Sequence, residues 1–187
     1  MSRGRISPSL VTAAVLAAAV FQLHHEGRVW WCACGHFYPW AGDIWSAHNS
    51  QHLFDPYSLT HVLHGLLFYG LLAWLVPRLA LPWRLTLTVA LEALWEVIEN
   101  SRWVIQRYRE ATIGLGYEGD SIANSLADIL CCCVGFALAR QLGFKGSAVL
   151  FVVTELVLLV WVRDNLTLNV LMLTCPIDAI KAWQMVH

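Results

Sequence analysis

Charged residues are scarce in this sequence. Of the 187 residues, 13% are charged and 58% are hydrophobic, whereas roughly a quarter of an ordinary soluble domain is charged. Ten residues are tryptophan, a side chain that favours the interface between lipid and water. This composition excludes an ordinary soluble domain and indicates a single integral membrane domain, because the length leaves no room for a second large one.

An excess of basic residues, a glycine-rich phosphate loop and internal repeats are also missing. The formal net charge is −1, so the chain offers no basic surface to nucleic acid. Without a phosphate-binding loop, no nucleotide site of that kind is expected. The two halves of the chain are not duplicated, which weighs against a carrier built from structural repeats.

The six cysteines lack the regular spacing of a disulfide framework. Cys131, Cys132 and Cys133 are consecutive in an apolar stretch, where we expect small buried side chains. Cys32 and Cys34 lie in the sequence Cys-Ala-Cys-Gly-His, outside the apolar stretches. Cys32, Cys34 and Cys175 could form a disulfide or bind a metal ion, and the sequence leaves both alternatives open. The short motif alone provides fewer than the four ligands that a structural zinc ion needs.

Five apolar segments predict an all-α fold, a polytopic transmembrane helical bundle with five spans. They cover residues 9–25, 59–76, 82–99, 121–142 and 148–165. A helix needs about 20 residues to cross a bilayer. Pro77 and Pro82 mark the second link, and Gly143 and Gly146 mark the last one. Residues 166–183 are predicted as a surface-lying or re-entrant helix, or as a sixth span.

The first segment has an alternative interpretation as a signal peptide. Arg3 and Arg5 precede the apolar run Leu10–Val20, and Ala17–Ala19 resembles a cleavage site. A retained anchor is favoured here. The site described below faces the same compartment under either interpretation.

Basic residues predict the orientation, because they concentrate in short cytoplasmic loops. With the N-terminus in the cytoplasm, the inner segments 1–8, 77–84 and 140–147 hold six basic residues in 24 positions. The outer segments 26–57, 100–120 and 163–187 hold six in 78 positions. We therefore expect a cytoplasmic N-terminus, with the chemistry on the outer face.

Polar residues form stripes on the predicted helices, with spacings that place each set on one helix face. These residues are His61 and His64 on the second helix, Glu92, Glu96 and Glu99 on the third, and Asp120, Asn124 and Asp128 on the fourth. An ionisable group inside a membrane is costly, so each one is a functional hypothesis. All of them lie toward the outer ends of their helices.

Imidazoles and carboxylates together are ligands of Zn²⁺, Mn²⁺ or non-haem iron. We expect His61, His64, Glu96 and Asp128 to converge as metal ligands. The predicted catalytic residues are Glu92, Glu99 and Asp120. The predicted substrate-binding residues are Asn49, Gln51, His52, Asn100, Arg102, Arg107, Arg109 and Asn124. The arginines suit an anionic headgroup, since a guanidinium binds phosphate through two parallel hydrogen bonds.

Two other interpretations stay open for the same residues. The stripes can form a non-catalytic binding or transport site. They can also be purely structural, with the carboxylates paired to arginines or hydrogen-bonded between helices. The enzyme hypothesis is a metal-dependent hydrolase or transferase that acts on a lipid or envelope precursor at the bilayer. Its rival is a carrier or assembly factor that binds a cation or polar ligand.

Several longer motifs, spread from about Cys32 to Trp183, resemble uncharacterised protein family 0314. They are Cys34–Gly35, Asn49–His52, Asp55–Ser58, His61–Gly65, Trp95–Ser101, Gly119–Ser121, Asn124–Ser125 and Arg163–Asn169. This resemblance implies a small multi-pass protein of the bacterial inner membrane, mainly in alphaproteobacteria, and it implies no activity or cofactor. A looser resemblance to VanZ-like membrane proteins covers Glu92–Gly135 and suggests a role in the cell envelope.

Overall fold

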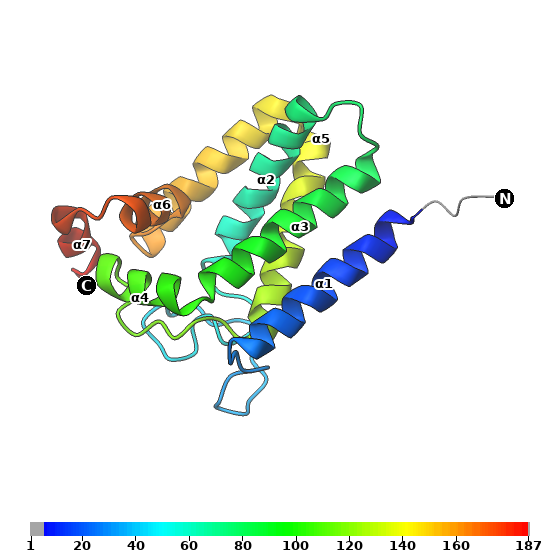
Figure 1. The fold of residues 1–187 in the computed structure, drawn as a ribbon. Helices are drawn as coiled ribbons and strands as arrows, with labels where there is room; N and C mark the ends of the chain where they lie inside the picture. Colours follow the sequence, from blue (N-terminus) through cyan, green and yellow to red (C-terminus); the bar gives the residue numbers. More distant parts are fainter. Residues whose placement is uncertain (1–5, 187) are drawn as a thin grey trace.

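The structure is a computed structural model that describes residues 6–186, so Arg3 and Arg5 lie outside the described residues. The described chain is all-helical and contains no strand (Figure 1). Its helices are α1 (Pro8–His25), α2 (Ser58–Leu75), α3 (Leu81–Glu99), α4 (Arg102–Ala111), α5 (Ile122–Trp161), α6 (Leu166–Thr174) and α7 (Asp178–Gln184).

The long helices begin and end where the sequence chemistry requires it. The last residue of α2 is Leu75, two positions before Pro77, and Pro82 lies in the first turn of α3. The N-cap of α5 is Ser121, whose hydroxyl accepts a hydrogen bond from the Asn124 amide. The polar residues of α5 therefore start one turn inside a capped helix end.

α5 is one element of 40 residues with a sharp corner at Gly143. Its φ of 66° and ψ of −176° are accessible to glycine and strained for other residues, so the chain turns there. Two arms, 122–142 and 144–161, meet at this corner and run in different directions (Figure 1). The sequence analysis placed the link at Gly143 and Gly146. In the structure the corner is a single residue, and Gly146 lies in the second arm.

Short helices occupy the segments that follow the long ones. α4 forms within the predicted connection 100–120, because the Ser101 hydroxyl accepts from the Val104 amide and caps it. The apolar segment 166–183 is divided into α6 and α7 by a break that contains Pro176. Glu155, in the second arm of α5, accepts hydrogen bonds from the Leu166 and Thr167 amides at the N-terminus of α6.

α2 and the first arm of α5 approach so closely that their backbones touch. A Cβ atom added to Gly65 would lie 2.0 Å from the carbonyl oxygen of Cys132. A Cβ atom added to Gly135 would lie 2.0 Å from the carbonyl oxygen of Val62. Only glycine fits at these two positions, as in closely packed membrane helices.

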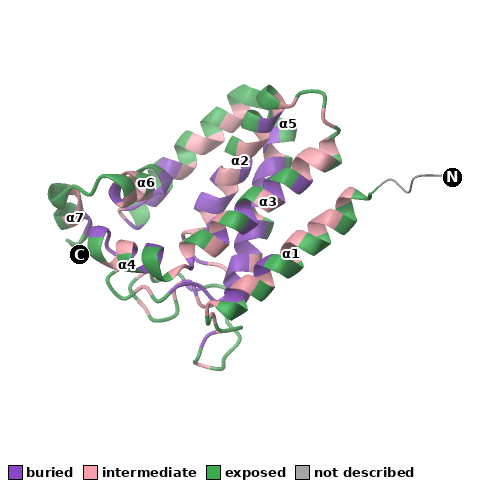
Figure 2. Cartoon of the chain, viewed as in Figure 1, coloured by how far each residue is buried: buried purple, intermediate pink, exposed green. Residues whose placement is uncertain are grey.

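The exposure pattern is the reverse of that of a soluble protein. The outer surfaces of the long helices expose large apolar side chains, including Phe21, Trp74, Phe144 and Val160 (Figure 2). The interior holds fully buried carboxylates, of which Glu92 is one. A soluble protein would expose the carboxylates and bury the apolar side chains, so this arrangement is typical of a protein surrounded by lipid.

Three helices are long and apolar enough to cross a membrane by length and composition, namely α1, α2 and α5. α3 has 19 residues but carries Arg84 and three glutamates, which lower its hydropathy. It packs against α1 through an apolar contact that includes Ala19, Val89 and Ala93. The three candidate spans indicate association with a membrane.

Candidate functional site

His61 lies at the centre of a buried cluster. Its Nδ1 atom is 2.6 Å from Oε1 of Glu92 and 3.4 Å from Oε1 of Glu96. Its Nε2 atom is 3.8 Å from Oδ2 of Asp128. Nδ1 of His64 is 3.0 Å from Oε1 of Glu92. These five residues, from α2, α3 and α5, are named the His61 cluster below.

The His61 cluster contains more negative than positive charge. Among the described residues, the ion-pair partners of Glu92, Glu96 and Asp128 are the imidazoles of His61 and His64, and no arginine or lysine pairs with them. Two imidazolium ions could not neutralise three carboxylates. The arrangement therefore calls for bound protons or a cation.

Glu96 is the carboxylate of the His61 cluster with the least compensation for its negative charge. It is fully buried, and neither of its carboxylate oxygens has a hydrogen-bond partner among the described residues. Glu99, one turn further along α3, has one oxygen in the same state, and its other oxygen accepts from the Tyr108 hydroxyl at 2.7 Å. Buried oxygens without hydrogen-bond partners are rare in proteins, so these oxygens are the atoms of the site best suited to accept a proton or a cation.

The geometry allows metal binding by two overlapping sets of side chains. One set is His61, His64 and Glu92, and the other is His61, Glu96 and Glu99. Within each set, one candidate ligand atom per residue lies within 4.8 Å of the others. The first set is already joined by hydrogen bonds, whereas the second contains the unpartnered oxygens.

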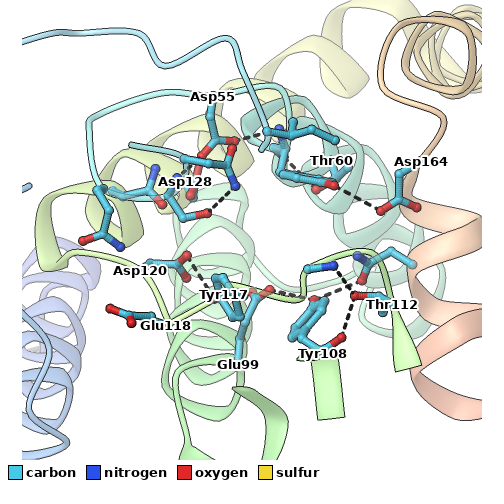
Figure 3. A pocket seen from close by; sticks show the side chains of 18 of the residues that line it. Asp55, Thr60, Glu99, Tyr108, Thr112, Tyr117, Glu118, Asp120, Asp128 and Asp164 are labelled. Carbon is cyan, nitrogen blue, oxygen red and sulfur yellow. Dashed lines mark hydrogen bonds between the residues drawn. The ribbon is translucent and has the colours of Figure 1, made fainter. Parts of the chain in front are cut away.

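A cavity of about 910 Å³ adjoins the His61 cluster, and His61, His64 and Asp128 are part of its wall. Its acidic lining residues are Asp55, Glu99, Glu118, Asp120, Asp128 and Asp164 (Figure 3). No arginine or lysine is among the described residues that line it. Such a wall suits a cation or a neutral ligand rich in hydrogen-bonding groups, rather than a free anion.

Tyrosines hold the carboxylates of the cavity wall in place. The Tyr117 hydroxyl donates to Asp120 at 3.0 Å (Figure 3). The Asn100 side-chain amide donates to the same carboxylate at 2.9 Å. Burial raises the pKa of Asp120, although these two hydrogen bonds oppose the shift. Burial also raises the pKa of Tyr117, with the nearby Asp120 charge adding to the shift. Tyr117 is therefore a proton donor to Asp120 rather than a phenolate.

The predicted substrate-binding residues fall into two groups. Asn49, Gln51 and Asn124 line the cavity. The amides of Gln51 and Asn124 donate to the backbone carbonyls of Gly119 and Leu53, so these side chains also tie loops together. His52 and Asn100 are buried and do not line the cavity.

The three predicted arginines do not line the cavity. Arg102 is exposed on α4. Arg107 donates to the carbonyl oxygen of Leu173, and Arg109 donates to that of Tyr117. Arg107 and Arg109 therefore connect α4 to neighbouring segments.

Other lining residues were outside the predicted site, among them Asp55, Tyr57, Tyr108 and Asp164. The Tyr57 hydroxyl donates to Asp164 at 3.2 Å, across 107 positions of sequence. Asp55, Tyr57 and Asp164 lie next to helix ends on the predicted outer face and within the family motifs Asp55–Ser58 and Arg163–Asn169, whereas Tyr108 lies inside α4. These residues come together because of how the loops fold, and helix periodicity does not predict loop conformation.

Asp164 gives the site a pH dependence that can be measured. Burial raises its pKa to about 6, although hydrogen bonds from Asn165 and Tyr57 oppose the shift. Because the pKa in the unfolded chain is near ~4, the folded state binds this proton more tightly. The resulting stabilisation is present below about pH 4 and is lost as the pH rises through about 6.

Replacement of Asp164 by Asn should remove this dependence, since an amide does not ionise. Between about pH 4 and pH 7 the wild type should lose about 2 kcal/mol relative to Asp164→Asn, at 1.36 kcal/mol per pKa unit, because the carboxyl of the unfolded chain is already partly ionised at pH 4. Thermal unfolding in detergent at the two pH values measures the difference. Parallel pH profiles for the two proteins would contradict the prediction.

The fold and the site together define a membrane-associated helical protein whose interior holds a His–carboxylate cluster beside an acidic cavity. The chain belongs to uncharacterised protein family 0314. The family model described as "Protein of unknown function (DUF2585)" matches residues 23–186. This confirms the family expected from the sequence motifs.

Relatives in alphaproteobacteria match over almost the whole chain. A UPF0314 protein of Rhizobium meliloti is 51% identical over 91% of this chain and 86% of its own length. UPF0314 proteins of Sphingopyxis alaskensis and Paracoccus denitrificans are 45% and 42% identical, over 94% and 96% of this chain and 93% of each relative. No solved structure matches the chain.

Proposed function

We propose that the protein crosses the bacterial inner membrane five times, with a cytoplasmic N-terminus. The spans would be α1, α2, α3 and the two arms of α5. The link between α2 and α3 and the corner at Gly143 lie at one end of the long helices (Figure 1). The density of basic residues favours the cytoplasm for that end. α4, α6 and α7 would then lie at the outer surface.

Cysteine labelling tests this topology. In a variant that keeps Cys32 and Cys34 and lacks the other native cysteines, Lys145→Cys should react with a membrane-impermeant maleimide, above the labelling of that parent, only after the cells are opened. Ser46→Cys, in the loop between α1 and α2, is the matched control and should react in intact spheroplasts. Labelling of residue 145 in intact spheroplasts would overturn the proposed orientation.

We propose further that a divalent metal ion binds at the edge of the His61 cluster, with His61 and Glu96 of the cluster and the neighbouring Glu99 as ligands. The unpartnered carboxylate of Glu96 carries this proposal, because a cation would satisfy both of its oxygens. Glu92 accepts from His61 and would orient that imidazole, as carboxylates behind metal-bound histidines do. Three protein ligands leave one position of a tetrahedral zinc ion open, which is typical of catalytic rather than structural zinc.

The open position would face the cavity, since Glu99 and His61 line it. A metal held at this place would supply Lewis-acid chemistry and could activate water as a nucleophile at neutral pH. Asp120 would act as a general base in the cavity, with Tyr117 and Asn100 holding its carboxylate. We therefore favour a metal-dependent hydrolase or transferase that acts on the polar part of a lipid or envelope precursor.

The acidic lining also favours a second candidate, a carrier or assembly factor that binds a cation without chemistry. The two candidate functions predict different results when the protein is reconstituted into proteoliposomes. An enzyme should release product from a lipid extract without moving metal across the bilayer. A carrier should move metal into the vesicles and leave the lipids intact.

Elemental analysis of the detergent-purified chain tests the metal proposal. The wild type should contain one more equivalent of zinc or manganese than Glu96→Gln, and metal bound elsewhere in the chain cancels in this comparison. Equal metal content in the two folded proteins would reject the proposed site.

A further inference from the structure

The loop between α1 and α2, residues 26–57, gathers four potential metal ligands. They are Cys32, Cys34, His48 and His52, and one ligand atom from each lies within 4.8 Å of the others. Sγ of Cys32 is 3.3 Å from Nδ1 of His48, and Sγ of Cys34 is 3.8 Å from Nε2 of His52. The two imidazole nitrogens are 3.4 Å apart. All these atoms converge on one point.

These separations match a tetrahedral zinc ion. Zinc bonds of roughly 2.0–2.3 Å to nitrogen and sulfur place two ligand nitrogens about 3.3 Å apart and a nitrogen–sulfur pair about 3.5 Å apart. The nitrogen pair is at 3.4 Å, and the two nitrogen–sulfur pairs are at 3.3 and 3.8 Å. These three separations are therefore close to those of a tetrahedral shell, and the remaining pairs lie within 4.8 Å.

Local backbone structure places each pair of ligands. The Gly35 amide donates to the Cys32 carbonyl oxygen at 3.2 Å and closes a tight turn around the two cysteines. Gly35 has a φ of 71°, a conformation that glycine adopts without strain. The second pair lies on successive turns, in which the Gln51 amide donates to the carbonyl oxygen of His48. This places His48 and His52 on one side of the chain.

The surroundings hold the ligands in position. The His52 ring is 1% exposed and lies edge-on between Trp31 and Tyr38, with ring centroids at 5.4 and 5.5 Å. Cys32 is also buried. The loop that carries these residues has no helix; its one β-bridge joins Trp40 to Phe54, and hydrogen bonds from Ser121 to Ser50 and from Gln51 to Gly119 attach it to the start of α5. A metal ion would connect its two ends directly.

We propose that Cys32, Cys34, His48 and His52 form a structural Cys₂His₂ zinc site. Four protein ligands leave no open position, so the ion would serve folding rather than catalysis. The site is distinct from the His61 cluster, although Cys32, Cys34 and His48 also line the cavity. Zinc binding would therefore fix the shape of one wall of the cavity. A Cys32–Cys34 disulfide is the competing fate of these thiols.

Metal stoichiometry in single variants tests the site. Cys34→Ser should lose one equivalent of zinc per chain, measured on full-length protein purified in detergent. Cys175→Ser is the matched control, because Cys175 is exposed at the end of α6 and should leave the zinc content unchanged. Glu96→Gln should keep this equivalent, so the two metal sites are separated. An unchanged zinc content in Cys34→Ser would overturn the proposal.

A second measurement on the wild type covers the case in which Cys34→Ser does not fold. Replacement of zinc by cobalt should give the visible absorption of tetrahedral Co²⁺ together with a thiolate-to-cobalt charge-transfer band. Alkylation of Cys32 and Cys34, followed by mass spectrometry, should be slow until a chelator is added, while Cys175 reacts throughout. Absence of the charge-transfer band, chelator-independent alkylation, or a Cys32–Cys34 disulfide in the isolated protein would each overturn the proposal.

Discussion

Glu96→Gln should abolish metal binding at the His61 cluster, and any activity with it, while the protein still folds. Glutamine has nearly the same shape as glutamate, so packing is preserved while the negative charge is lost. Because neither oxygen of Glu96 has a hydrogen-bond partner among the described residues, the substitution breaks no such bond. The substitution also removes the free-energy cost of burying a carboxylate whose oxygens accept no hydrogen bond. The metal-free variant should therefore be at least as stable as the metal-free wild type.

Glu155→Gln is the matched control for Glu96→Gln. Glu155 is also buried, but it accepts hydrogen bonds from the Leu166 and Thr167 amides at the N-terminus of α6. Loss of its charge should cost about 1–2 kcal/mol of stability through the helix dipole. Its metal content should stay at the wild-type level. Metal content and thermal unfolding in detergent distinguish the two variants. A marked loss of stability with unchanged metal in Glu96→Gln would show that Glu96 is structural.

Gly65→Ala should destabilise the protein by about 3 kcal/mol or more, as overpacking of a tight core does. The added Cβ would lie 2.0 Å from the Cys132 carbonyl oxygen, and a backbone atom cannot move aside as a flexible side chain can. α2 must therefore separate from α5. The separation would also displace α2 and with it His61, a proposed ligand that now lies 3.4 Å from Glu96. A lower melting temperature in detergent and loss of metal are both expected.

Gly70→Ala provides the comparison on the same helix. A Cβ atom at Gly70 would have no neighbour within 4 Å. Alanine there should stabilise α2 by about 0.5–1 kcal/mol, since glycine is a poor helix former. If both substitutions lowered the melting temperature equally, close packing at Gly65 would not be the cause.

Helix periodicity predicted part of the candidate site from the sequence. The spacing of Glu92, Glu96 and Glu99 placed them on one face of a helix, and the structure has that helix as α3. The same reasoning gave similar depths for His64 and Asp128. It could not show that one imidazole, His61, contacts residues of both α3 and α5. Neighbours across helices depend on the packing at Gly65 and Gly135, which the sequence does not specify.

The loops were the least predictable part. The sequence contains Cys32 and Cys34, followed by His48 and His52 after a spacer, and both pairs have spacings that a metal site can use. The sequence indicated a possible metal site only for Cys32 and Cys34, together with Cys175. Nothing in the sequence shows that the chain brings His48 and His52 back to the two cysteines. A loop without regular structure has no periodicity from which such a contact can be inferred.

The backbone contact between α2 and α5 also has a consequence for how molecules exchange with the cavity. Helices that touch at Gly65 and Gly135 move as one rigid body, since any separation loses the whole packed seam. Slow motions that open the cavity are therefore expected in the connecting segments that have no regular structure. These are the 112–121 connection and residues 35–47 of the 26–57 loop, between the two pairs of proposed zinc ligands. The rate at which a ligand is exchanged would then be set by loop fluctuations on the outer face, with the helical frame as a stationary wall.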